Sequence, residues 1–139
     1  MIKEEIITKV KTLNLPKGSF VVFGAAPLAV LGIREANDID LLVSSETYKK
    51  LKNSGWKELP KGPNDIPLVY DVFEAHDNWN FSPYSPKLEH LLASAIEFEG
   101  VLFASLNEVR KWKSVSGRPK DLLDLKLIDQ YLEKITPFR

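Results

Sequence analysis

The sequence predicts a small α/β (α+β) domain in which helices flank a small mixed β-sheet. Short runs of β-branched and aromatic residues, typical of strands, alternate with segments whose apolar residues recur at the helical period. Glycines and prolines stand between these segments, where the chain is expected to turn. With 139 residues the chain fits one compact unit, and we expect a single domain over residues 1–139.

The first half of the chain predicts helices that alternate with strands. Each expected helix carries apolar residues three or four positions apart and stops near a glycine or a proline. Each expected strand is a short apolar run. The helices are expected at residues 2–13, 27–31 and 46–54, and the strands at residues 19–23 and 38–43.

The second half predicts a strand, a hairpin and further helices. The hairpin turns at Glu99-Gly100. Ser105 and Glu108 have the spacing of a capping box, in which each side chain satisfies a free amide at a helix start. Residues 75–86 show no assignable pattern. The expected elements are a loop at 60–67, a strand at 68–73, a helix at 88–93, the hairpin at 96–103, a helix from 105, and a last helix after 117 to about 133.

Composition and charge exclude several classes of protein. Nineteen basic residues balance nineteen acidic ones, which argues against binding nucleic acid through bulk charge. The absence of cysteine excludes disulfides and thiolate metal sites. No apolar run reaches the roughly 18 residues of a membrane helix, and the acidic start does not resemble a signal peptide. We therefore expect a cytoplasmic protein with no membrane partner.

One segment between residues 109 and 120 is basic despite the balanced total. It holds five cations and no acid, namely Arg110, Lys111, Lys113, Arg118 and Lys120. By itself such a run is typical of a solvated helix face. The other interpretation is a local patch for phosphate groups.

The acidic pair Asp38 and Asp40 lies in the expected strand at residues 38–43. Side chains alternate along a strand, so both carboxylates project from one face while Ile39 and Leu41 can be buried on the other. Two adjacent carboxylates repel each other, and a divalent cation removes that repulsion. Magnesium prefers such oxygen ligands. The alternative is a turn residue at Asp38 and an exposed strand edge at Asp40.

Asp71 supports the metal interpretation. It interrupts the otherwise apolar strand expected at residues 68–73, and a charged residue is unusual in such a strand unless it has a ligand or a partner. A role as the third metal ligand, on a neighbouring strand, accounts for it, so the predicted metal and catalytic set is Asp38, Asp40 and Asp71. Glu74, at the strand end, is a weaker candidate and is expected to face solvent.

Two further features have competing interpretations. Small residues in the turn Gly24-Ala25 let backbone amides approach a phosphate, but tight turns favour small residues in any case. His76 and His90 show no metal-ligand spacing. Aromatic residues could stack a base or an acceptor ring, or simply fill the core; they are Trp56, Trp79, Phe81 and Tyr84.

The motifs around these residues resemble the nucleotidyltransferase superfamily, which carries a small-residue turn, a helix and an Asp-x-Asp strand. The later basic segment is similar to the carboxy-terminal signature of small bacterial nucleotidyltransferases, including those related to AbiEii-type toxins of toxin–antitoxin systems. The resemblance covers residues 19–130. Its motifs are Val22–Ala26, Leu31–Arg34, Asp38–Val43, Glu99–Phe103, Ser105-Leu106, Lys113 and Gly117–Leu125.

The resemblance implies the nucleotidyltransferase fold and a two-metal reaction that uses Mg²⁺. A nucleoside monophosphate would pass from a nucleoside triphosphate, such as ATP, to a hydroxyl acceptor, with Asp38, Asp40 and Asp71 at the metals. The implied nucleotide-binding residues are Gly24, Ala25, Arg34, Lys113, Arg118 and Lys120. An alternative role for Arg118 and Lys120 is a salt-bridge network with Asp121 and Asp124 at the start of the last helix.

Three functions remain open at this stage. The first is an active nucleotidyltransferase whose acceptor is a tRNA end, a partner protein or a small molecule such as an antibiotic. The second is an inactive nucleotide- or partner-binding module, which Ala25 favours because the family has glycine or serine there. The third, a purely structural domain, leaves Asp71 unexplained. A partner protein or a homodimer is also left open.

Overall fold

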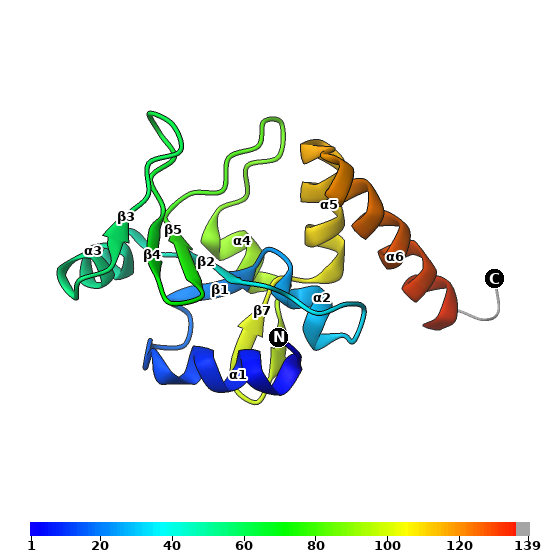
Figure 1. The fold of residues 1–139 in the computed structure, drawn as a ribbon, viewed down its shortest axis with the longest axis horizontal. Coiled ribbons are helices and arrows are strands. Elements are labelled where there is room, and N and C mark those ends of the chain that lie inside the picture. The colour runs from blue at the N-terminus through cyan, green and yellow to red at the C-terminus, as the bar shows by residue number, and fades with distance from the viewer. Residues whose placement is uncertain (136–139) are drawn as a thin grey trace.

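The computed structural model describes residues 1–135, and within them seven strands form one mixed sheet (Figure 1). Across the sheet the strands follow the order β3-β4-β5-β2-β1-β7-β6. The strands are β1 Phe20–Phe23, β2 Ile39–Val43, β3 Lys57–Glu58, β4 Leu68–Tyr70, β5 Phe73–His76, β6 Ile96–Phe98 and β7 Val101–Phe103. The helices are α1 Lys3–Thr12, α2 Ala26–Val30, α3 Ser45–Asn53, α4 Leu88–Ala93, α5 Leu106–Ser116 and α6 Pro119–Ile135.

The three central strands bring two carboxylates side by side at one end of the sheet. Strands β1 and β2 are antiparallel, with Phe23 opposite Asp40. Strands β2 and β5 are parallel, with Asp40 opposite Glu74. Residues directly opposite each other point to the same face of a sheet. The end of β1 therefore lies beside the starts of β2 and β5, where the acidic residues stand.

Helices bury both faces of the sheet. Helices α1, α2 and α3 cover one face, and α4, α5 and α6 supply the apolar side chains of the other. Alternation along β1 sends Val22 to the first core and Val21 to the second. Asp40 shares the second face with Leu42, two residues further along β2. Figure 1 shows α5 and α6 packed side by side at the right of the sheet.

Most expected elements are confirmed within two residues of their predicted ends. The hairpin turns as predicted, since Glu99 and Gly100 adopt the positive φ angles 50° and 84°. Strand β3 was not predicted. In residues 1–135, no helix has the combination of length and apolar composition that crossing a membrane requires.

The single strand predicted at residues 68–73 is wrong. The chain reverses at Asp71, which adopts φ 52°, and the two halves pair as the antiparallel strands β4 and β5. Aspartate tolerates this left-handed conformation better than most residues, so it suits a tight turn. Strand β5 then continues to His76, into the segment whose pattern is not assignable.

The capping box predicted at Ser105 is half formed. The Ser105 hydroxyl accepts a hydrogen bond from the Glu108 amide at 3.3 Å. The Glu108 carboxylate does not complete the box. It accepts a hydrogen bond from the Tyr84 hydroxyl at 2.9 Å, and His90 and Lys111 also contact it. Glu108 is buried, so these partners offset the cost of removing its charge from water. The contacts fasten the loop before α4 to α5.

Candidate active site

Four carboxylates line a cleft of about 660 Å³ at the end of the sheet, and one of them, Asp65, comes from the loop at residues 60–67. Asp40 lies on β2 and Glu74 lies opposite it on β5, while Asp38 directly precedes β2. Burial and the neighbouring charges of Asp40 and Glu74 raise the pKa of Asp38. The negative charge of Asp38 is therefore disfavoured beside these two acids, and a bound cation would relieve the repulsion.

Glu74 occupies the position that the sequence predicted for Asp71. The turn at Asp71 lies outside the cleft, and its half-exposed carboxylate pairs with Lys9 at 3.1 Å. Glu74, which was expected to face solvent, has only 16% of its side chain exposed. The structure thus brings together Asp38, Asp40 and Glu74, and it does not bring Asp71 to them. The signal that could have found Glu74 is its place between the buried residues Phe73 and Ala75.

His76 joins these acids, although its sequence spacing gave no reason to expect it. Its Nε2 atom lies 3.3 Å from Glu74 Oε1 and 3.8 Å from Asp40 Oδ1. Burial lowers the pKa of His76, but its ion pairs with the two carboxylates outweigh this and raise the pKa to about 9. The contact with His76 is the main cause that lowers the pKa of Glu74 to about 2.

The donor atoms around Asp40 fit a metal ion. Asp40, Glu74 and His76 each offer one ligand atom, and these atoms lie within 4.8 Å of one another. Carboxylate oxygens suit Mg²⁺ and Mn²⁺, and imidazole nitrogen is a common ligand of transition-metal ions. Asp38 lines the same cleft and could add a further oxygen.

Gly24 permits this arrangement because it has no side chain. Its φ angle is +67°, and a Cβ atom built there would lie 2.1 Å from Asp40 Oδ2. The turn that follows β1 therefore approaches the Asp40 carboxylate more closely than any other residue would allow. Ala25, next in the chain, lines the cleft.

Two of the cations predicted to bind phosphate, Lys113 and Arg34, form ion pairs with buried aspartates. Lys113 has 3% of its side chain exposed and lies 2.8 Å from Asp124 and 3.4 Å from Asp121. Arg34 makes two hydrogen bonds to Asp124, at 2.7 and 2.8 Å. Both cations line the cleft, but their charges are already paired. For these two residues the contacts match a salt-bridge network that joins α5 and α6 to the segment before β2.

The other two predicted cations are more accessible to a ligand. Arg118 binds Asp121 through its side chain at 2.7 Å, yet 44% of that side chain is exposed. Lys120 lines the cleft, and its charge partly offsets the rise in the pKa of Asp38. Arg118 directly precedes α6 and Lys120 lies in its first turn; both line the cleft and are exposed, so their charges are accessible to a bound anion.

Acidification is expected to destabilise this network through Asp121. Burial opposes its ionisation, but hydrogen bonds from Arg118 prevail and lower the pKa of Asp121 to about 2. A carboxyl group with a depressed pKa adds stability above its unfolded pKa of about 4, and this is lost as the pH falls toward 2. We expect a loss of up to about 2 kcal/mol in the free energy of unfolding. Urea denaturation at pH 6 and pH 2.5 measures it, and Asp121→Asn should reduce the difference; the part that remains includes the contribution of Glu74, whose pKa is also lowered to about 2.

The aromatic residues belong to the two cores, and some of them also line the cleft. Trp79 stacks on Phe23 with ring centroids 4.6 Å apart, and Trp112 meets Trp79 edge to face at 5.0 Å. Trp79 and Trp112 are buried and belong to the second core, and Trp56 belongs to the first. Trp79 and Trp112 also line the cleft, and Phe81, which lines it too, is half-buried, so Phe81 is the most exposed of these three aromatic residues.

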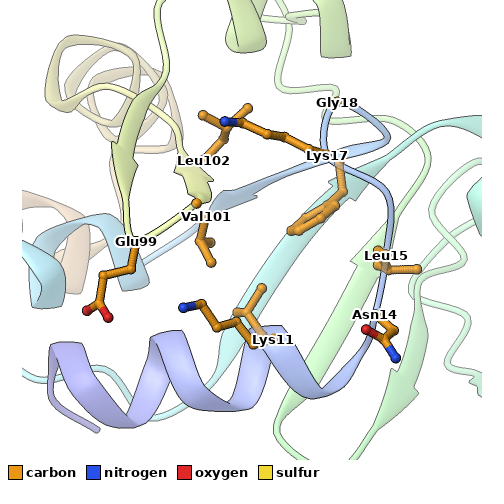
Figure 2. Close-up of a pocket in the computed structure, with 11 residues that line it drawn as sticks. Lys11, Asn14, Leu15, Lys17, Gly18, Glu99, Val101 and Leu102 are labelled. Atoms are coloured by element: carbon orange, nitrogen blue, oxygen red, sulfur yellow. The ribbon is translucent and has the colours of Figure 1, made fainter.

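A second cavity, of about 350 Å³, lies between α1 and the β6–β7 hairpin (Figure 2). It is near Phe20, at the opposite end of β1 from Gly24. Figure 2 shows Lys11 and Glu99 rising from separate walls around Val101. Glu99 is the only acid that lines it, so this cavity lacks the convergent carboxylates of the cleft.

Solved nucleotidyltransferase structures share this fold, although no family model and no curated protein matches the chain. A candidate nucleotidyltransferase from Thermotoga maritima aligns over 96% of both chains with a TM-score of 0.60 and 18% identity. The complex of ANT(2'')-Ia with adenylyl-2''-tobramycin aligns over 93% of this chain and 86% of its own, with a TM-score of 0.54 and 14% identity. The solution structure of the antibiotic-resistance factor ANT(2'')-Ia aligns over 93% of this chain and 81% of its own, with a TM-score of 0.53 and 17% identity. The predicted nucleotidyltransferase fold is confirmed, and the AbiEii-type subgroup stays a prediction.

Proposed function

We propose that this chain is a nucleotidyltransferase, which moves a nucleoside monophosphate from a nucleoside triphosphate to a hydroxyl acceptor. The observation that carries the proposal is the convergence of Asp38, Asp40 and Glu74 in one cleft, directly beside the Gly24 turn. Three carboxylates gathered against a tight turn have no structural need for one another, and they are a suitable site for metal-bound phosphates.

Asp38, Asp40 and Glu74 would hold one or two Mg²⁺ ions, with His76 as a further donor. Such ions neutralise the triphosphate and make the acceptor hydroxyl a better nucleophile. Glu74 replaces Asp71 in this role because Asp71 lies in a turn outside the cleft. Because Gly24 has no side chain, it leaves room for the Asp40 carboxylate.

The remaining predicted residues divide into direct and indirect contributors. Arg118 and Lys120 would bind the triphosphate, since both line the cleft and keep accessible charge. The backbone of Gly24 and Ala25 would approach the β- and γ-phosphates. Lys113 and Arg34 would act chiefly by holding α6 in place through Asp124.

The acceptor is a tRNA end, a protein side chain or a small molecule. One structural neighbour is bound to an adenylylated antibiotic, which supports transfer of a nucleoside monophosphate to a small hydroxylated molecule. A place in a toxin–antitoxin system, a protein partner, a homodimer and a cytoplasmic location stay predictions.

The test follows the two ends of a labelled triphosphate. With ³²P at the α-phosphate, we expect label to move to an acceptor from a panel of total tRNA, protein and aminoglycosides. With ³²P at the γ-phosphate, the label should leave as pyrophosphate. Asp40→Asn should abolish both signals, and Asp71→Asn should keep them. Magnesium-dependent nucleotide binding without transfer would favour the inactive binding module instead.

A further inference from the structure

The loop at residues 60–67 connects β3 and β4, at the upper left of Figure 1, and contributes to the lining of the acidic cleft. Pro60 and Pro67 bound it, and a narrow turn closes its tip, where the Lys61 amide donates to the Asp65 carbonyl at 2.8 Å. Residues 61 to 65 all line the cleft. The tip of this loop therefore forms one wall of the proposed active site.

Polar contacts fasten the loop tip to the site. Lys61 Nζ donates to Glu74 Oε1, the same oxygen that His76 Nε2 approaches at 3.3 Å. Asp65 lies 4.0 Å from the other nitrogen of His76. The Asn78 side chain donates to the Asn64 carbonyl at 3.4 Å. The main contact, from Lys61, is thus made to one of the three convergent carboxylates.

Lys61 stands where its charge competes with a metal ion. Glu74 is one of the residues whose ligand atoms lie within 4.8 Å of each other, and Lys61 binds Glu74 directly. A dication held by Asp40 and Glu74 would repel an ammonium group at that distance. The lysine ammonium is a compact charge on a flexible stem, and 44% of this side chain is exposed, so it can move away without unfolding the loop.

We propose that Lys61 is a substrate-responsive cation, which pairs with Glu74 while the site holds no metal and moves to the triphosphate when metal and nucleotide bind. This inference rests on the proposed function, because it requires a metal–triphosphate site in the cleft. It gives Lys61 two opposite effects: it weakens the binding of metal alone and strengthens the binding of metal with nucleotide. A lysine that only stabilised the loop would not produce effects of opposite sign.

The test measures both effects on Lys61→Gln. Electron paramagnetic resonance of free Mn²⁺ should report binding of Mn²⁺ alone that is about three- to tenfold tighter than in the wild type, since one competing charge is gone. Calorimetry with Mn²⁺ and the tightest-binding of ATP, GTP, CTP and UTP should report about tenfold weaker nucleotide binding, the loss of one charged contact to phosphate. Lys61→Arg should restore part of the nucleotide affinity.

Lys52→Gln is the matched control. Lys52 pairs with Glu58 at 2.5 Å on the same side of the molecule, but it does not line the cleft, so both affinities should stay at the wild-type values. Unchanged or weaker Mn²⁺ binding by a folded Lys61→Gln variant would overturn the inference. A wild-type protein that binds neither Mn²⁺ nor any nucleotide would instead overturn the proposed function.

Discussion

Asp40→Asn is expected to weaken magnesium-dependent nucleotide binding by at least about 100-fold, or about 2.7 kcal/mol. Asp40 is the central acid of the cluster: it lies opposite Glu74 on β5, beside Gly24 and 3.8 Å from His76. The amide keeps the shape of the carboxylate but removes the charge that a dication needs. Isothermal titration calorimetry with the tightest-binding nucleotide measures the change.

Asp71→Asn is the matched control for this prediction. It makes the same chemical change in the turn between β4 and β5, where Asp71 pairs with Lys9 and the side chains of Lys9 and Asp71 are 39% and 50% exposed. Such a pair is worth about 1 kcal/mol or less, so nucleotide binding should stay unchanged. Equal losses in Asp40→Asn and Asp71→Asn would contradict the assignment of Glu74 in place of Asp71.

Gly24→Ala is expected to remove nucleotide binding nearly as completely as Asp40→Asn. The added Cβ would lie 2.1 Å from Asp40 Oδ2, so the carboxylate or the turn must move. The φ angle of +67° adds backbone strain of about 1 kcal/mol for any residue other than glycine. Thermal unfolding and calorimetry on the same sample separate the loss of stability from the loss of binding.

Gly32→Ala supplies the control for Gly24→Ala. Gly32 has a similar φ of +73°, but a Cβ atom there meets nothing within 4 Å. We expect Gly32→Ala to lose about 1 kcal/mol of stability from strain alone and to keep wild-type nucleotide affinity. If both alanine variants bound nucleotide equally well, the close approach of Gly24 to Asp40 would not matter for the site.

Local sequence patterns were sufficient to find two of the three clustered acids and misleading for the third. Asp38 and Asp40 were found because alternation along a strand places them on one face, and this depends only on neighbours in the sequence. Asp71 was misplaced because the pattern does not mark where β4 ends. The chain turns at Asp71, which has a positive φ angle, so the apolar run forms two strands. The third carboxylate of the cluster is therefore that of Glu74, on the second of these strands.

The charged residues show a second limit of sequence analysis. The basic run at residues 109–120 was correctly identified as charged, but its pairing depends on contacts between distant elements. Lys113 is buried against Asp124 of the next helix, and Asp124 also binds Arg34 from the segment before β2, 90 residues earlier. No pattern in the sequence indicated a role for Lys61. Its partner Glu74 lies on β5, and their contact depends on how the loop at residues 60–67 folds.

The most direct test of the nucleotidyltransferase assignment is a calorimetric titration of ATP, GTP, CTP and UTP into the wild-type protein with Mg²⁺. The cluster of Asp38, Asp40 and Glu74 predicts that at least one triphosphate binds with a stoichiometry of one and that EDTA abolishes the binding. Binding of no nucleotide, in a sample shown to be folded, would contradict the assignment and leave a domain that has the fold without the function.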